Sequence, residues 1–177
     1  MLVVFLVFAG STLFVNGMHL IRSNGTAAER DFDGKDAAVL NIFTGMIGLC
    51  IVVVTLAKYA TDATMLPSAA YIALFALTYI WVGINAFTGA NGKALGWFSF
   101  VVPFVGIPAG VNGLQKAASV FEYWMAVNWF AWSILWFLFF LLLAKEIKIP
   151  RFTGYVAVAQ AVGTALVPAV LSFYGAI

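Results

Sequence analysis

The run Tyr123–Ala144, YWMAVNWFAWSILWFLFFLLLA, decides the fold class of this chain. It contains no charged residue and is long enough to cross the hydrocarbon core of a bilayer as one helix. Of the 177 residues in the chain, 64% are hydrophobic and 9% are charged, whereas a soluble domain has roughly 25% charged residues. The sequence therefore predicts an integral membrane protein.

Five further apolar runs have a similar length, so the chain offers six candidate membrane spans. We predict an all-α integral membrane fold, a six-transmembrane-helix bundle of three helical hairpins. The first run lacks a basic segment and a small-residue cleavage site, so we expect it to be retained rather than removed as a signal peptide. The predicted spans are 2–21, 37–57, 68–87, 95–114, 123–144 and 152–174.

The basic residues predict how the helices are oriented. The loops after the first, third and fifth spans contain seven of the nine Lys and Arg residues, and the loops after the second and fourth spans contain only Lys58 and Lys116. Loops rich in Lys and Arg remain in the cytoplasm. We therefore expect both termini of this multi-pass membrane protein to lie outside.

Several functional classes are disfavoured by residues that the spans lack. No Asp, Glu, Lys or Arg lies well inside a span, whereas proton- or ion-coupled pumps need such groups. The chain has one histidine, His19, and one cysteine, Cys50, so a catalytic triad or a histidine-based metal site cannot be assembled. We expect a protein that is not an enzyme and that has no cofactor and no metal. The net charge of +2 is too small to indicate a nucleic-acid partner.

A tryptophan stripe lies deep in the run quoted above. Trp129, Trp132 and Trp136 follow steps of three and four, which place them on one helix face. Trp132 would lie roughly 13 Å along a helix that spans about 30 Å, far from the headgroups where membrane tryptophans usually gather. A buried indole N–H needs a partner in the protein or in a wet cavity. On this pattern alone, a lined passage and helix packing are equally good interpretations.

The third span contains a second stripe, in which Leu77, Trp81 and Asn85 recur at steps of four. Asn128 and Gln160 add side-chain amides within other spans. A single amide in a membrane helix more often joins two helices than contacts a solute. Together, however, flat aromatic walls and neutral amides would suit a planar neutral solute and would exclude ions.

The order and spacing of several motifs resemble the UreI/AmiS family of urea and short-chain amide channels. The resemblance covers essentially the whole chain and is most specific at Trp129-x-x-Trp132-x-x-Leu135–Trp136. The other matching pieces are Asn16–Gly17, Ala38–Val39–Leu40–Asn41–Ile42–Phe43–Thr44–Gly45, Thr78–Tyr79–Ile80–Trp81, Trp97–Phe98–Ser99, Lys148–Ile149–Pro150 and Thr164–Ala165–Leu166–Val167–Pro168–Ala169.

The resemblance implies that 1–177 form a single six-helix channel domain with its own pore. It also implies a homohexameric ring whose centre is closed by membrane lipid, and passive permeation of urea or small amides. Two departures stand out: Gln160 occupies the position of a family glutamate, and the outer loops contain no histidine. Because histidine is the usual switch near neutral pH, we expect no acid gating.

The function predicted from the sequence is a passive, ion-excluding channel for urea and/or short-chain aliphatic amides. The alternative is a non-transporting membrane scaffold or accessory subunit, in which the tryptophans would only pack. The residues expected along the substrate pathway are Leu77, Trp81, Trp129, Trp132, Trp136, Gln160, Asn85 and Asn128.

Overall fold

The computed structural model describes residues 1–23, 32–59, 61–62 and 64–177. Six helical spans in this part of the chain are long and apolar enough to cross a membrane, which agrees with the predicted all-helical bundle. The last span is not one regular helix, because a π-helical turn interrupts it. The elements are α1 (Leu2–Arg22), α2 (Gly34–Tyr59), α3 (Leu66–Thr88), α4 (Lys93–Lys116), α5 (Val120–Leu143), α6 (Pro150–Gln160), η2 (Ala161–Leu166) and α7 (Val167–Phe173).

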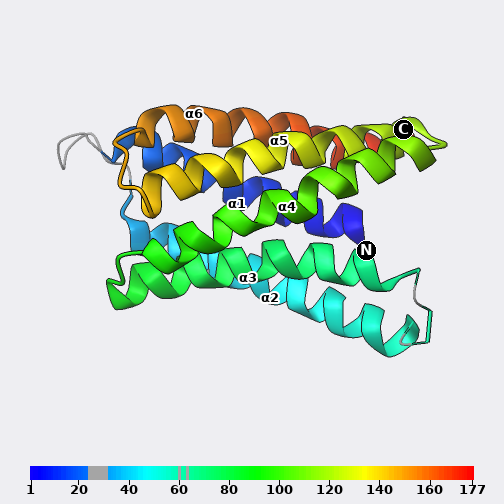
Figure 1. Cartoon of the computed structure of the whole chain (residues 1–177), viewed down its shortest axis with the longest axis horizontal. Coiled ribbons are helices and arrows are strands. Elements are labelled where there is room, and N and C mark those ends of the chain that lie inside the picture. The colour runs from blue at the N-terminus through cyan, green and yellow to red at the C-terminus, as the bar shows by residue number, and fades with distance from the viewer. Residues whose placement is uncertain (24–31, 60, 63) are drawn as a thin grey trace.

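Successive spans run in opposite directions, so the bundle has two distinct ends (Figure 1). The end of α1 and the start of α2 lie at one end together with the connections from α3 to α4 and from α5 to α6, and we call it the basic end. Both termini lie at the opposite end, which we call the terminal end. The described basic residues at or next to the basic-end connections are Arg22, Lys35, Lys93, Lys145, Lys148 and Arg151.

Glycines allow the helices to pack closely in three pairs. A Cβ on Gly45 of α2 would lie 2.7 Å from the Ala76 carbonyl oxygen of α3. A Cβ on Gly96 of α4 would lie 2.6 Å from the Ala144 nitrogen at the end of α5. The closest pairs are thus α2 with α3, α4 with α5, and α1 with the last span. The helix ends expected to meet at the basic end do meet there. The closest packing, however, is not within those predicted hairpins: it joins α2 to α3 and α4 to α5, which are connected at the terminal end, and α1 to the last span.

Paired polar side chains join α1 to α2. The amides of Asn16 and Asn41 exchange two hydrogen bonds, with N···O distances of 2.9 and 2.7 Å. The hydroxyl groups of Thr12 and Thr44 lie 2.7 Å apart. Thr12, Asn41 and Thr44 are fully buried, so these bonds satisfy groups that would be costly to leave unpaired in a membrane.

Local capping defines two helix starts. Ser119 accepts a hydrogen bond from the Glu122 N–H, and Glu122 accepts one from the Ser119 N–H, which forms a capping box at the start of α5. Before α2, hydrogen bonds from the backbone N–H groups of Asp36 and Lys35 lower the pKa of the Asp33 carboxyl group. An ionised Asp33 favours the helix start, because the helix dipole is positive there.

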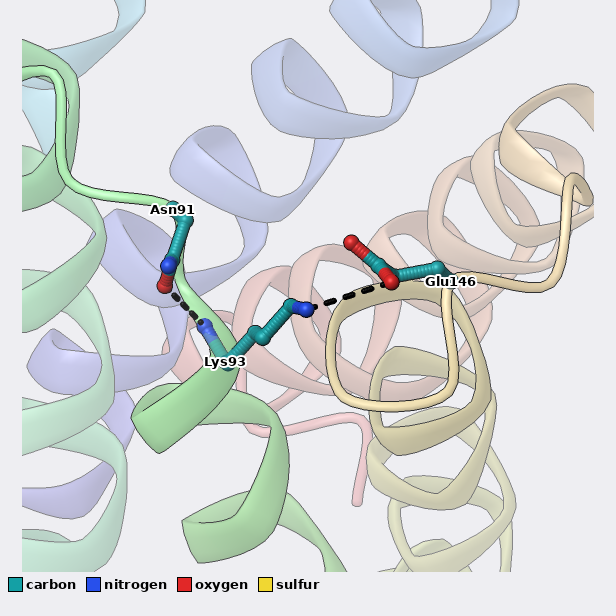
Figure 2. A network of polar contacts seen from close by, with 3 residues as sticks. All are labelled: Asn91, Lys93 and Glu146. Atoms are coloured by element: carbon teal, nitrogen blue, oxygen red, sulfur yellow. Dashed lines mark hydrogen bonds and ion pairs between the residues drawn. The ribbon is translucent and has the colours of Figure 1, made fainter.

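An ion pair joins two connections at the basic end (Figure 2). The Lys93 ammonium lies 3.2 Å from a carboxylate oxygen of Glu146, and the Lys93 N–H donates to the Asn91 side chain. Both charged side chains are exposed, so the pair contributes only about 0–1 kcal/mol. It marks the position where the α3–α4 connection meets the α5–α6 connection.

Candidate functional site

Two cavities occupy the space between the closely packed helix pairs. The basic-end cavity has a volume of about 290 Å³ and is lined by α1, α3, α4 and α5. The terminal-end cavity has a volume of about 330 Å³ and is lined by α1, α2, α3, α5 and η2. Polar residues lining the first include Asn16, His19, Asn85, Asn91 and Ser99; residues lining the second include Met1, Met65, Met125, Thr55, Ser68 and Tyr71.

Four residues line both cavities, and we call them the neck: Leu13, Phe75, Tyr79 and Trp132. The Phe75 and Trp132 rings pack edge to face, with centroids 4.9 Å apart. The Tyr79 hydroxyl donates a hydrogen bond to the Ala9 carbonyl oxygen at 3.1 Å, which ties the α3 phenol to α1. Three of the four neck residues are therefore aromatic, and contacts between helices set the positions of their side chains.

The tryptophan stripe of α5 faces the cavities. Trp129 lines the terminal-end cavity, Trp132 lines both, and Trp136 lines the basic-end cavity. Phe75 lies close to all three rings, at centroid distances of 6.0, 4.9 and 4.5 Å respectively. The Trp132 N–H also has the interior partner that an indole at this depth needs, because it donates to the Thr164 hydroxyl at 2.8 Å. The three tryptophans therefore pack against Phe75 and also line the two cavities.

Of the three residues in the stripe predicted on α3, only Asn85 lines a cavity. Asn85 lines the basic-end cavity, but Leu77 is 46% exposed and lines neither cavity. Trp81 packs against Phe98 and also lines neither cavity. Each step of four residues turns about 40° around a helix, so Leu77 points about 80° away from Asn85. This geometry does not support placing Leu77 and Trp81 opposite the α5 tryptophans.

Two neck residues, Phe75 and Tyr79, were not among the residues that the sequence predicted. Tyr79 belongs to a motif quoted for the family resemblance, and Phe75 precedes it by four residues. An aromatic pair at this spacing shares a helix face and could have been found in the sequence. Only the packing of α3 shows that this face, rather than the Leu77 face, meets α5.

Two of the predicted amides join helices instead of lining a cavity. The Gln160 side chain donates to the Ala131 carbonyl oxygen at 2.7 Å, and Asn128 donates to the Thr164 carbonyl oxygen at 2.8 Å. Both bonds connect α5 to the last span, and neither residue lines the two cavities. The Gln160 Oε1 atom is buried without a hydrogen-bond partner among the described residues.

Comparison with known proteins places this architecture in a family. The family described as AmiS/UreI family transporters matches residues 1–176. The chain belongs to the AmiS/UreI family. This confirms the resemblance inferred from the motifs. Because the family is one of transporters, it also confirms the prediction of a membrane transport protein rather than an enzyme.

Three relatives with described roles align with most of the chain. A Rhodococcus erythropolis protein described as the transporter AmiS2 is 35% identical over 172 residues, which are 96% of this chain and 78% of the relative. A Mycolicibacterium smegmatis protein described as a transporter of amidate substrates is 34% identical, over 96% of this chain and 75% of its own length. The acid-activated urea channel of Helicobacter pylori is 29% identical, over 93% of this chain and 96% of the channel.

Two solved structures share the fold of this chain. The crystal structure of the urea channel from Helicobacter pylori superposes with a TM-score of 0.84 at 27% identity, covering 99% of each chain. The cryo-electron microscopy structure of the same channel in a closed state gives a TM-score of 0.86 at 26% identity, with both chains fully covered. The predicted six-helix membrane fold is thus confirmed, and the chain is a multi-pass membrane protein.

Proposed function

We propose that this chain is a single channel domain that lets urea and/or short-chain aliphatic amides cross the membrane passively. One observation carries the proposal: cavities toward opposite ends of the bundle meet at the neck of Leu13, Phe75, Tyr79 and Trp132. A non-transporting scaffold would have no need for two cavities that share four lining residues. The names of the family relatives agree with urea or amides as solutes.

The chemistry of the two cavities suits a small neutral solute. No Asp, Glu, Lys or Arg is among the described residues that line them, and apolar side chains predominate. Moving a neutral amide from water into such a space costs far less free energy than moving an ion. At the basic end, the amides of Asn85 and Asn91 can replace part of the solute's water. We therefore propose that the channel excludes ions.

Stopped-flow light scattering on proteoliposomes tests the proposed function. Vesicles with purified protein should shrink in a urea or acetamide gradient and then re-swell faster than protein-free vesicles. The same vesicles should maintain an imposed proton gradient as long as protein-free vesicles do, because the pathway excludes ions. Re-swelling no faster than in protein-free vesicles would favour the scaffold alternative. Uptake that needs a proton gradient would instead indicate a coupled transporter.

We also predict that flux depends little on external pH. The terminal end, which we propose faces outside, has no histidine in its connections, and the only histidine, His19, lines the basic-end cavity. With internal pH held at about 7.5, changing external pH from about 7.5 to 5 should alter urea flux less than about twofold, because the external connections contain no histidine, the usual switch in that range. Several-fold activation by external acid would contradict this prediction.

The outer surface supports proposals about assembly and location. Side chains of α4 such as Val101, Phe104 and Trp97 are 55%, 67% and 49% exposed, so this face needs lipid or another subunit. We propose a homohexamer with lipid closing the ring centre, in the bacterial inner membrane with both termini outside. Native mass spectrometry would measure the number of subunits and the retained lipid.

A further inference from the structure

The last span is broken at a defined place. At the end of η2, the Val167 N–H bonds to the Val162 carbonyl oxygen, which lies five residues back instead of the usual four. Pro168 follows and has no N–H to donate. A wide turn followed by proline leaves backbone carbonyl groups of the preceding turn without helical partners. In a membrane these groups must be satisfied by other parts of the protein.

Side chains of α5 satisfy the broken turn. Trp124 donates its indole N–H to the Gly163 carbonyl oxygen at 2.9 Å, and Asn128 donates to the Thr164 carbonyl oxygen at 2.8 Å. Trp132 donates to the Thr164 hydroxyl at 2.8 Å. The three donors are spaced by four residues, so one face of α5 is hydrogen-bonded to η2.

The direction of the hydrogen bonds at Thr164 is determined by its chemistry. A hydroxyl group has one hydrogen, and the Thr164 hydroxyl donates it to the Gln160 carbonyl oxygen at 2.6 Å. The same oxygen is therefore free to accept from the Trp132 indole, which can only donate. Thr164 and Trp132 are 8% and 7% exposed, so water does not compete freely for this bond.

We propose that Thr164 is a positioning residue, which fixes the plane of the Trp132 indole at the neck and so sets which solutes pass. Thr164 lines neither cavity and acts through Trp132. The hydrogen bond holds one edge of the indole, while the Phe75 ring packs edge to face against it at 4.9 Å. Without the Thr164 hydroxyl, the Trp132 N–H has no acceptor in this position, so the indole can rotate toward another one. The effect on selectivity rests on the proposed channel function.

The selectivity test compares permeability to urea with permeability to the larger amide propionamide. Thr164→Val keeps the side-chain shape but removes the acceptor, and it should lower the discrimination between the two solutes at least threefold. Thr164→Ser keeps the hydroxyl and should retain the wild-type ratio. Thr153→Val is the matched control, because Thr153 is buried in α6 and its hydroxyl has no hydrogen-bond partner among the described residues. A wild-type ratio in Thr164→Val would overturn the proposal.

A spectroscopic measurement tests the position of the indole without relying on flux. Protein labelled with 5-fluorotryptophan contains six reporters for fluorine NMR, and Trp132→Phe identifies the signal of Trp132. That signal should move in Thr164→Val and stay in place in Thr153→Val. Thr164→Ala, which cannot overcrowd the site, serves if the valine variant does not fold. An unchanged Trp132 signal refutes the positioning role. If the wild-type protein shows no solute flux but the Trp132 signal shifts in Thr164→Val, only the channel function is refuted.

Discussion

Replacing Trp132 with alanine is expected to produce the largest change in transport. The indole lines both cavities and packs against Phe75, so its removal joins two spaces of about 290 and 330 Å³. Pockets discriminate solutes by steric contact, and losing this ring should reduce the selectivity for urea over propionamide by about tenfold or more. Stopped-flow permeability measurements at equal amounts of reconstituted protein give the ratio directly.

Two further variants show whether the pathway has been placed correctly. Trp136→Ala should have a smaller effect than Trp132→Ala, because Trp136 lines only the basic-end cavity. Leu77→Ala should leave selectivity unchanged, since Leu77 lines neither cavity. A change in Leu77→Ala as large as that in Trp132→Ala would contradict the pathway through the neck. It would instead support the stripe that the sequence alone predicted.

Gly154→Leu is expected to have the largest effect on stability. A Cβ at this position would lie 2.7 Å from the Gly17 carbonyl oxygen and 2.9 Å from the Ile21 nitrogen. Both are backbone atoms of α1, so the steric clash can be removed only if α1 and α6 move apart. Overpacking of this kind costs about 3 kcal/mol. The variant should show a lower thermal unfolding temperature, measured by the loss of monodisperse protein on heating in detergent.

A second glycine of the same span provides the control. A Cβ at Gly163 would have no heavy atom within 4 Å, whereas one at Gly154 would meet backbone. Gly163→Ala should therefore leave the unfolding temperature unchanged or raise it slightly, since alanine favours helix over glycine by about 1 kcal/mol. Gly154→Ala should lower it. Equal behaviour of the two alanine variants would show that close approach to α1 does not limit stability.

The sequence predicted the part of the site that one helix determines by itself. Trp129, Trp132 and Trp136 share a face because helix geometry requires it, and that face does meet the cavities. Phe75 and Tyr79 also share a face, but nothing local distinguishes that face from the one containing Leu77. The roles of Asn128 and Gln160 could not be read from the sequence either. Their acceptors are backbone carbonyl groups at Thr164 and Ala131, and those contacts exist only after the helices pack.

The sequence by itself determined that this chain crosses a membrane six times as helices. Apolar runs of that length are favourably solvated by the hydrocarbon of a bilayer. In hydrocarbon, the backbone N–H and C=O groups must form their hydrogen bonds within each helix. Only the tertiary structure decided which helices pair, which face of α3 lines the neck, and why Trp132 is held by Thr164. These features depend on close approach at glycines such as Gly17 and Gly154, and on carbonyl groups released by the broken turn before Pro168.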